Sequence, residues 1–107
     1  MQQVNASDLS RLLASPESGK LQLLDVREEW EFSICQIEGS RNVPMAQIPA
    51  AVQGLDPRLP TVVICHHGMR SAQVADYLER CGFDKVINLD GGIDAWAREV
   101  DPNMPVY

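Results

Sequence analysis

Residues 61–72 read TVVICHHGMRSA, and this stretch decides both the fold and the site that the sequence predicts. The β-branched residues 62–64 are typical of a buried strand, which ends at Cys65, and a helical pattern opens at Ser71. A thiol is thereby placed between the end of a strand and the start of a helix. Because loop and helix N–H groups point at such a position, they stabilise negative charge on the sulfur. We therefore expect Cys65 to be a nucleophile rather than a core cysteine.

Short apolar runs alternate with helical patterns along the rest of the chain. This alternation predicts an α/β domain with a mostly parallel sheet of about five strands and helices on both faces. Strands are expected at Val4 and over residues 21–26, 41–43, 61–64 and 86–89, and helices over residues 7–13, 28–34, 45–53, 71–81 and 93–100. Pro49 is expected to compress or interrupt the helix over residues 45–53. Asn5 or Ser7 should cap the first helix, which is expected to stop near Pro16 and Gly19.

Length and charge exclude several classes of protein. A chain of 107 residues suits a single domain, here residues 1–107, and no apolar run approaches the roughly 20 residues of a membrane span. The N-terminus does not read as a signal peptide, so we expect a cytoplasmic location. With 15 acidic against 9 basic residues, the net charge of −6 repels nucleic acid and anionic membranes, and neither is an expected partner.

Several segments of the sequence resemble the successive signatures of the rhodanese family. Their order and spacing match, and the resemblance covers essentially the whole chain. The segments are LLDVREEWEF (23–32), IEGSRNVP (37–44), VVICHHGMRSA (62–72), LERCGFDKVINLDGGIDAW (78–96) and MPV (104–106). The resemblance implies an α/β domain that carries sulfane sulfur as a cysteine persulfide.

On this resemblance, Cys65 is the expected catalytic residue of a thiosulfate sulfurtransferase. Its thiolate would attack the outer sulfur of thiosulfate or a related donor, and cyanide or a thiol, including a protein thiol, would then accept that sulfur. A non-enzymatic or partner-dependent persulfide relay is the alternative. No cofactor is expected. A metal ion held by Cys65, His66 and His67 is not expected either, because three consecutive residues rarely converge on one ion.

The length of the loop separates this chemistry from that of phosphatases and arsenate reductases on the same scaffold. Those enzymes have Cys-x5-Arg, whereas Cys65 and Arg70 here form Cys-x4-Arg. A longer loop makes a wider amide cradle for a tetrahedral phosphate, and the shorter loop suits a single sulfur atom. Gly68 permits the positive φ or the close backbone approach that such a cradle needs. A phosphatase or arsenate reductase is therefore the less favoured alternative.

The other loop residues are expected to line the site. Arg70 should add positive charge near the thiolate or an anionic donor, or tie the loop to the sheet. Ser71 should be the helix N-cap, with a hydroxyl that can also face the sulfur. His66 and His67 are expected at a solvent-exposed entrance, where partial positive charge would help thiosulfate to approach. Met69 is expected to form an apolar lip of the pocket or simply to pack.

Two charged residues lie at the end of the second expected strand. Asp25 and Arg27 belong to the DVR signature, and topology puts them beside the Cys65 loop. The resemblance implies that Asp25 helps to hold this loop and that Arg27 forms ion pairs around it, in a role we interpret as structural support. Glu31 lies four residues after Arg27 and is an expected partner for its side chain.

The three cysteines form no CxxC pair, which argues against a disulfide framework and fits a reducing compartment. Cys35 and Gln36 stand where many relatives have Gly-His. We interpret Cys35 either as a thiol that resolves the Cys65 persulfide or as a small apolar residue that fills a gap. Cys81 falls on the apolar face of its helix, so a buried structural role is expected for it.

Overall fold

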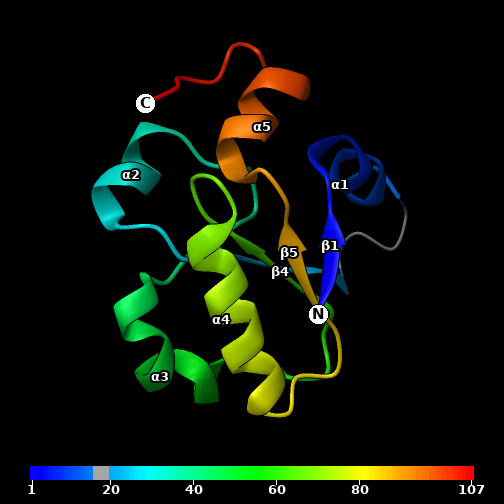
Figure 1. Ribbon diagram of the computed structural model, residues 1–107, viewed down its shortest axis with the longest axis vertical. Helices are drawn as coiled ribbons and strands as arrows, with labels where there is room; N and C mark the ends of the chain where they lie inside the picture. The colour runs from blue at the N-terminus through cyan, green and yellow to red at the C-terminus, as the bar shows by residue number, and fades with distance from the viewer. Residues whose placement is uncertain (16–19) are drawn as a thin grey trace.

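A five-stranded parallel sheet forms the centre of the protein in the computed structural model, which describes residues 1–15 and 20–107 (Figure 1). The strands are β1 (Gln2–Val4), β2 (Gln22–Asp25), β3 (Arg41–Asn42), β4 (Thr61–Ile64) and β5 (Val86–Leu89). Their order across the sheet is β1-β5-β4-β2-β3, and each pairing between these strands is parallel. The predicted fold class is therefore confirmed.

Helices connect the strands. The α-helices are α1 (Ala6–Leu13), α2 (Glu29–Ile34), α3 (Ile48–Ala51), α4 (Met69–Arg80) and α5 (Gly92–Glu99), and the short 3₁₀ helices η2 (Met45–Gln47) and η3 (Val52–Gly54) flank α3. The single helix predicted over residues 45–53 is thus divided into three short turns. Pro49 lies in the first turn of α3, the only part of a helix that tolerates a residue without an N–H group. None of the helices in the described residues could cross a membrane.

The N-terminal cap of α1 is Asn5, one of the two residues predicted for it. Its side chain accepts a hydrogen bond from the backbone N–H of Asp8 at 2.8 Å, which satisfies one of the free donors at the start of the helix. The stop that we expect near Pro16 and Gly19 falls outside the described residues.

Alternating side chains along β4 divide the core into two apolar clusters, one on each face of the sheet. Val62 and Ile64 pack with residues of α1 and α5, whereas Val63 and Cys65 pack with residues of α4 and with Ile48 of α3. In Figure 1 the sheet is seen between α3 and α4 on the left and α1 on the right. The side chain of Cys65 therefore points toward α4.

Cys81 does not lie in the core, which corrects the expectation for it. The helix α4 ends at Arg80, and the chain then turns through Gly82, whose φ is +94°. Phe83 fills the place in the apolar cluster that the helical pattern would assign to Cys81. Cys81 is consequently exposed.

Candidate active site

The sulfur of Cys65 lies directly after β4, inside the loop that leads to α4. The backbone N–H of Gly68 donates a hydrogen bond to Cys65 Sγ at 3.0 Å, and Ser71 Oγ lies 3.2 Å from the same sulfur. A loop amide thus faces the sulfur, as the sequence predicts. The N-terminus of α4, a helix of 12 residues, adds the positive end of its dipole at this place.

Cys65 is more enclosed than a nucleophile at an open entrance would be. The residue is only 1% exposed, whereas Met69 in the same loop region is 77% exposed. The sulfur points toward α4, so the loop backbone covers it on one side and the buried Ser71 on the other. Solvent therefore has little access to Cys65 in this structure.

The helix α4 begins at Met69, earlier than the sequence predicts. Its N-cap is Gly68, which has the expected positive φ of +103°. A Cβ atom at Gly68 would lie 3.2 Å from the backbone nitrogen of Gly91, so a side chain there would also press on the backbone just before α5. Ser71 is therefore not the N-cap. It lies in the first turn of α4, and this position turns its hydroxyl toward Cys65.

Asn88 of β5 links this part of the site to the sheet, a role that the sequence analysis missed. Ser71 Oγ donates a hydrogen bond to Asn88 Oδ1, and Asn88 Nδ2 donates to the carbonyl of Gly68 at 3.1 Å. Because the Ser71 hydroxyl donates its only proton to Asn88, its oxygen can accept a hydrogen bond from the thiol of a protonated Cys65. To donate a hydrogen bond to a Cys65 thiolate, the hydroxyl must rotate away from Asn88. The available signal was a single amide side chain within the apolar strand VINL.

Arg70 is tied to Glu31 of α2. Its Nη1 donates to Glu31 Oε1 at 2.7 Å and its Nη2 donates to Oε2 at 2.8 Å, which is a bidentate ion pair. The expected ion pair of Glu31 with Arg27 is wrong, because Arg27 precedes the N-cap of α2 and so lacks the helical spacing on which that expectation rests. Arg27 instead donates to the backbone carbonyl of Glu31 at 3.1 Å.

Asp25 and Arg27 form a fully buried ion pair, with both side chains 0% exposed. Arg27 Nη2 donates to Asp25 Oδ2 at 2.7 Å and to the carbonyl of Cys35 at 2.6 Å, and Asn42 Nδ2 donates to the carbonyl of Arg27 at 2.9 Å. These bonds fasten the segment that carries α2 to the sheet. Asp25 therefore supports the Cys65 loop indirectly: it helps to hold α2 in place, and Glu31 of α2 binds Arg70.

Tyr107 lies over the same group of residues and was not expected there. Its hydroxyl donates to Glu31 Oε2 at 2.8 Å and accepts from Arg27 Nη1 at 3.0 Å. Burial raises the pKa of Tyr107 to about 12. Tyr107 follows the last expected helix and directly follows the signature segment MPV (104–106), but nothing in that segment indicates a contact with Arg27 or Glu31.

The two histidines differ in their surroundings. His67 is exposed, as expected, but His66 is half-buried and its ring stacks on that of Tyr107 with centroids 4.0 Å apart. Burial, and secondly the adjacent His67, lower the pKa of His66 below its ordinary value of 6.5. This shift weakens the positive charge that His66 is expected to bring to the entrance.

Cys35 is buried on the face of the sheet opposite to Cys65. Cys35 packs in the cluster that contains Val62 and Ile64, and Cys65 packs in the other cluster. This arrangement disfavours Cys35 as a resolving thiol and favours its interpretation as a small apolar residue.

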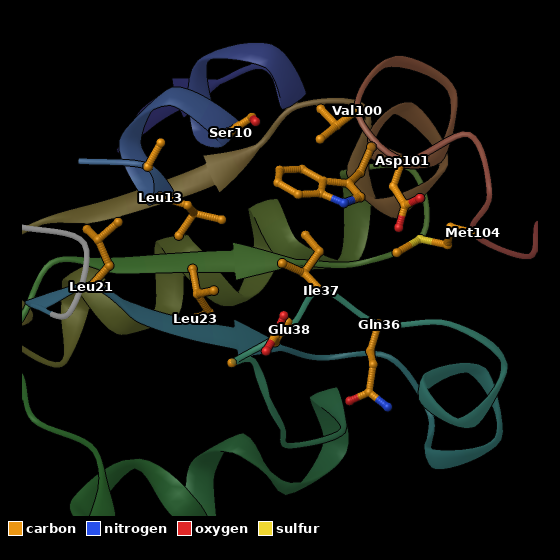
Figure 2. Close-up of a pocket in the computed structure, with 13 residues that line it drawn as sticks. Ser10, Leu13, Leu21, Leu23, Gln36, Ile37, Glu38, Val100, Asp101 and Met104 are labelled. Carbon is orange, nitrogen blue, oxygen red and sulfur yellow. The ribbon is translucent and has the colours of Figure 1, made fainter. Parts of the chain in front are cut away.

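A cavity of about 770 Å³ lies away from Cys65 (Figure 2). Leu23, Ile37 and Trp96 contribute to its apolar wall, between α1, α5 and the segment of residues 36–39. None of the candidate site residues lines it, so it does not define the active site.

The ion pair of Glu31 with Arg70 predicts how the free energy of unfolding depends on pH. Hydrogen bonds from Arg70 lower the pKa of Glu31 from 4.5 to about 2, so the folded protein favours the ionised carboxylate. The stability due to this group is present above pH 4.5 and is lost as the pH falls toward 2. We expect the difference in free energy of unfolding between the wild type and Glu31→Gln, measured with urea, to shrink over this range. A constant difference between these pH values would contradict the assignment.

The arrangement described here defines a class of protein: a parallel α/β domain with a loop-bound free cysteine at the carboxyl end of a central strand. The chain belongs to the rhodanese-like domain family, whose sequence pattern matches residues 6–99. The family indicated by the sequence signatures is thereby confirmed.

Proteins named as sulfurtransferases are among its relatives. Thiosulfate sulfurtransferase GlpE of Shewanella oneidensis is 34% identical over 88 residues, which cover 82% of this chain and 87% of that protein. GlpE of Pseudomonas fluorescens is 39% identical over 74 residues, which cover 69% of this chain and 68% of that protein. These names support a sulfurtransferase role for the family.

Other relatives are longer. The Rhodanese-like/PpiC domain-containing protein 12, chloroplastic, of Arabidopsis thaliana is 41% identical over 90 residues, but the match covers 80% of this chain and only 30% of that protein. Among solved structures, a rhodanese-like domain protein of Staphylococcus aureus has a TM-score of 0.83 and 29% identity, covering 100% of this chain and 99% of its own.

Proposed function

We propose that this protein is a sulfurtransferase that carries sulfane sulfur as a persulfide on Cys65. The donor is thiosulfate or a related compound, and the acceptor is cyanide or a thiol, including a protein thiol. The observation that carries the proposal is the hydrogen bond from the Gly68 N–H to Cys65 Sγ at 3.0 Å, at the N-terminus of α4. The relatives named thiosulfate sulfurtransferase support the choice of donor.

The proposed reaction has two displacement steps. The Cys65 thiolate attacks the outer sulfur of thiosulfate, the sulfur–sulfur bond of the donor breaks, and sulfite leaves with the electron pair. The acceptor then attacks the outer sulfur of the persulfide, and the Cys65 thiolate leaves. Cyanide becomes thiocyanate, and a thiol becomes a persulfide. The Gly68 amide and a rotated Ser71 hydroxyl stabilise the negative sulfur in both steps.

The family and the composition support a setting for this activity. We propose that residues 1–107 act as one rhodanese-like domain in the cytoplasm, where its three free cysteines stay reduced. No cofactor takes part in the proposed reaction. The net charge of −6 argues against nucleic acid and anionic membranes as partners.

A partner-dependent persulfide relay is the second candidate, and the burial of Cys65 favours it. With 1% of the residue exposed, a free small donor has little access to the sulfur, whereas a docked protein could widen the loop. Steady-state kinetics separate the two functions. An enzyme saturates with thiosulfate, while a relay reacts slowly with thiosulfate and rapidly with the persulfide of one protein partner.

Sulfur loading followed by mass spectrometry tests both candidates. After treatment with thiosulfate or with a protein persulfide, we expect the wild type to gain one sulfur atom and Cys65→Ser to gain none. Cys81→Ser is the matched control, because it removes an exposed thiol outside the loop and should load normally. Loading that persists in Cys65→Ser, or its absence in the wild type with both donors, would overturn the proposal.

A further inference from the structure

Three side chains with metal-binding atoms gather at the outer side of the Cys65 loop. His66 and His67 come from the loop, and Asp94 comes from the first turn of α5. One donor atom from each lies within 4.8 Å of the other two. We propose that His66, His67 and Asp94 together bind a divalent transition-metal ion such as Zn²⁺ or Co²⁺, for which imidazole and carboxylate are suitable ligands.

Main-chain hydrogen bonds fix Asp94 against the loop. The N–H of Asp94 donates to the carbonyl of His66 at 3.1 Å, and the N–H of Ile93 donates to the carbonyl of Cys65 at 2.8 Å. Gly92 makes this approach possible, since a Cβ atom there would lie 2.4 Å from the carbonyl oxygen of His66. The fold therefore supplies Asp94 as the third metal ligand. Sequence spacing does not reveal it, and this is why no metal site is expected from consecutive residues alone.

The ring of His66 contacts two aromatic rings, of which Tyr107 is the stacked one. It stacks on Tyr107 at a centroid distance of 4.0 Å and lies 3.9 Å from the ring of His67. Donor atoms around a tetrahedral ion with bonds of about 2.0 Å lie roughly 3.3 Å apart. The exposed His67 and the short side chain of Asp94 can close the remaining gap by rotation, while His66 stays in place.

Arg98 competes with the ion for Asp94, and the Cys65 sulfur competes with the three proposed ligands for the ion. Neither competes strongly. Arg98 pairs with Asp94 at 3.3 Å; the Asp94 side chain is 18% exposed, but that of Arg98 is 73% exposed, so solvent screens the pair from the arginine side and weakens it. The Cys65 sulfur, a softer ligand, is enclosed by Gly68 and Ser71 on the inner side of the loop. The ion therefore takes nitrogen and oxygen ligands on the outer side.

Titration of the reduced, metal-free protein with Co²⁺ tests the proposal. Visible absorption reports Co²⁺ in a protein site, and a near-ultraviolet sulfur-to-metal band appears only when a thiolate is a ligand. We expect saturation at one ion per chain without that band. We also expect His67→Ala and Asp94→Asn each to weaken binding about tenfold or more.

A matched control separates a site from general attraction to acidic side chains. Asp76 pairs with Arg80 on α4 at the same helical spacing as Asp94 with Arg98 on α5, so Asp76→Asn removes the same charge elsewhere. It should bind Co²⁺ as the wild type does, and Arg98→Gln should bind it more tightly. Equal affinity of Asp94→Asn and Asp76→Asn, a sulfur-to-metal band in the wild type, or the absence of saturable binding would each overturn the proposal. None of these measurements depends on sulfur transfer.

Discussion

Asp25→Asn is expected to lower the free energy of unfolding by about 3–5 kcal/mol, the usual cost of removing one partner from a buried ion pair. Both Asp25 and Arg27 are 0% exposed, and the variant leaves the guanidinium of Arg27 without its counter-charge. The carbonyl of Cys35 and the hydroxyl of Tyr107 still accept its hydrogen bonds, but they do not neutralise it. Since a domain of this size is stable by about 5–15 kcal/mol, the loss is a large fraction of the total.

Urea unfolding measures this effect, and Asp76→Asn is its control. Asp76 and Arg80 form an exposed pair on α4, for which a change below about 1 kcal/mol is expected. If both variants unfold at the same urea concentration, the buried pair does not stabilise the fold. A variant of Asp25 that fails to accumulate as folded protein agrees with the expectation, provided that Asp76→Asn folds.

Gly92→Ala is expected to lower the free energy of unfolding by about 2 kcal/mol or more, and to impair sulfur loading at Cys65. Gly92 has a φ of +62°, and a Cβ atom would lie 2.4 Å from the carbonyl oxygen of His66 and 2.5 Å from that of Cys65. Both are main-chain atoms, so they cannot move aside without displacing the loop. The substitution therefore acts on the start of α5 and on the loop together.

Gly54→Ala provides the comparison, because a Cβ atom at Gly54 meets open space. We expect its stability and its sulfur loading to stay near those of the wild type. Urea unfolding and mass spectrometry after thiosulfate treatment measure the two properties. Wild-type behaviour of Gly92→Ala in both would contradict the close contact between α5 and the loop.

The fold was predictable because its signals are local. The β-branched residues 62–64, the glycine that follows Cys65 in the loop and the apolar face of α4 each concern neighbours along the chain. Residue spacing also predicts on which face of a strand a side chain lies. Residue spacing does not predict how deeply a side chain is buried, so the enclosure of Cys65 by its own loop does not follow from the sequence.

The ion pairs of the site were less predictable, because their partners lie far apart in the sequence. Glu31 and Arg70 are 39 positions apart, and Tyr107 is 76 positions from Glu31. Helical spacing suggested Arg27 for Glu31, but spacing holds only inside a continuous helix. Asn88 carried a weak signal as a polar residue in an apolar strand. The neighbouring sequence does not indicate that Ser71 and Gly68 are its hydrogen-bond partners.

The separation of Cys35 and Cys65 by the sheet bears on how the protein would withstand peroxide. A sulfenic acid on Cys65 cannot close a disulfide with Cys35 while β4 stays packed, because the two side chains face opposite cores. Cys81 follows the far end of α4, a helix of 12 residues that spans about 18 Å. While the domain stays folded, neither of the other two cysteines in residues 1–107 can therefore reduce the oxidised sulfur.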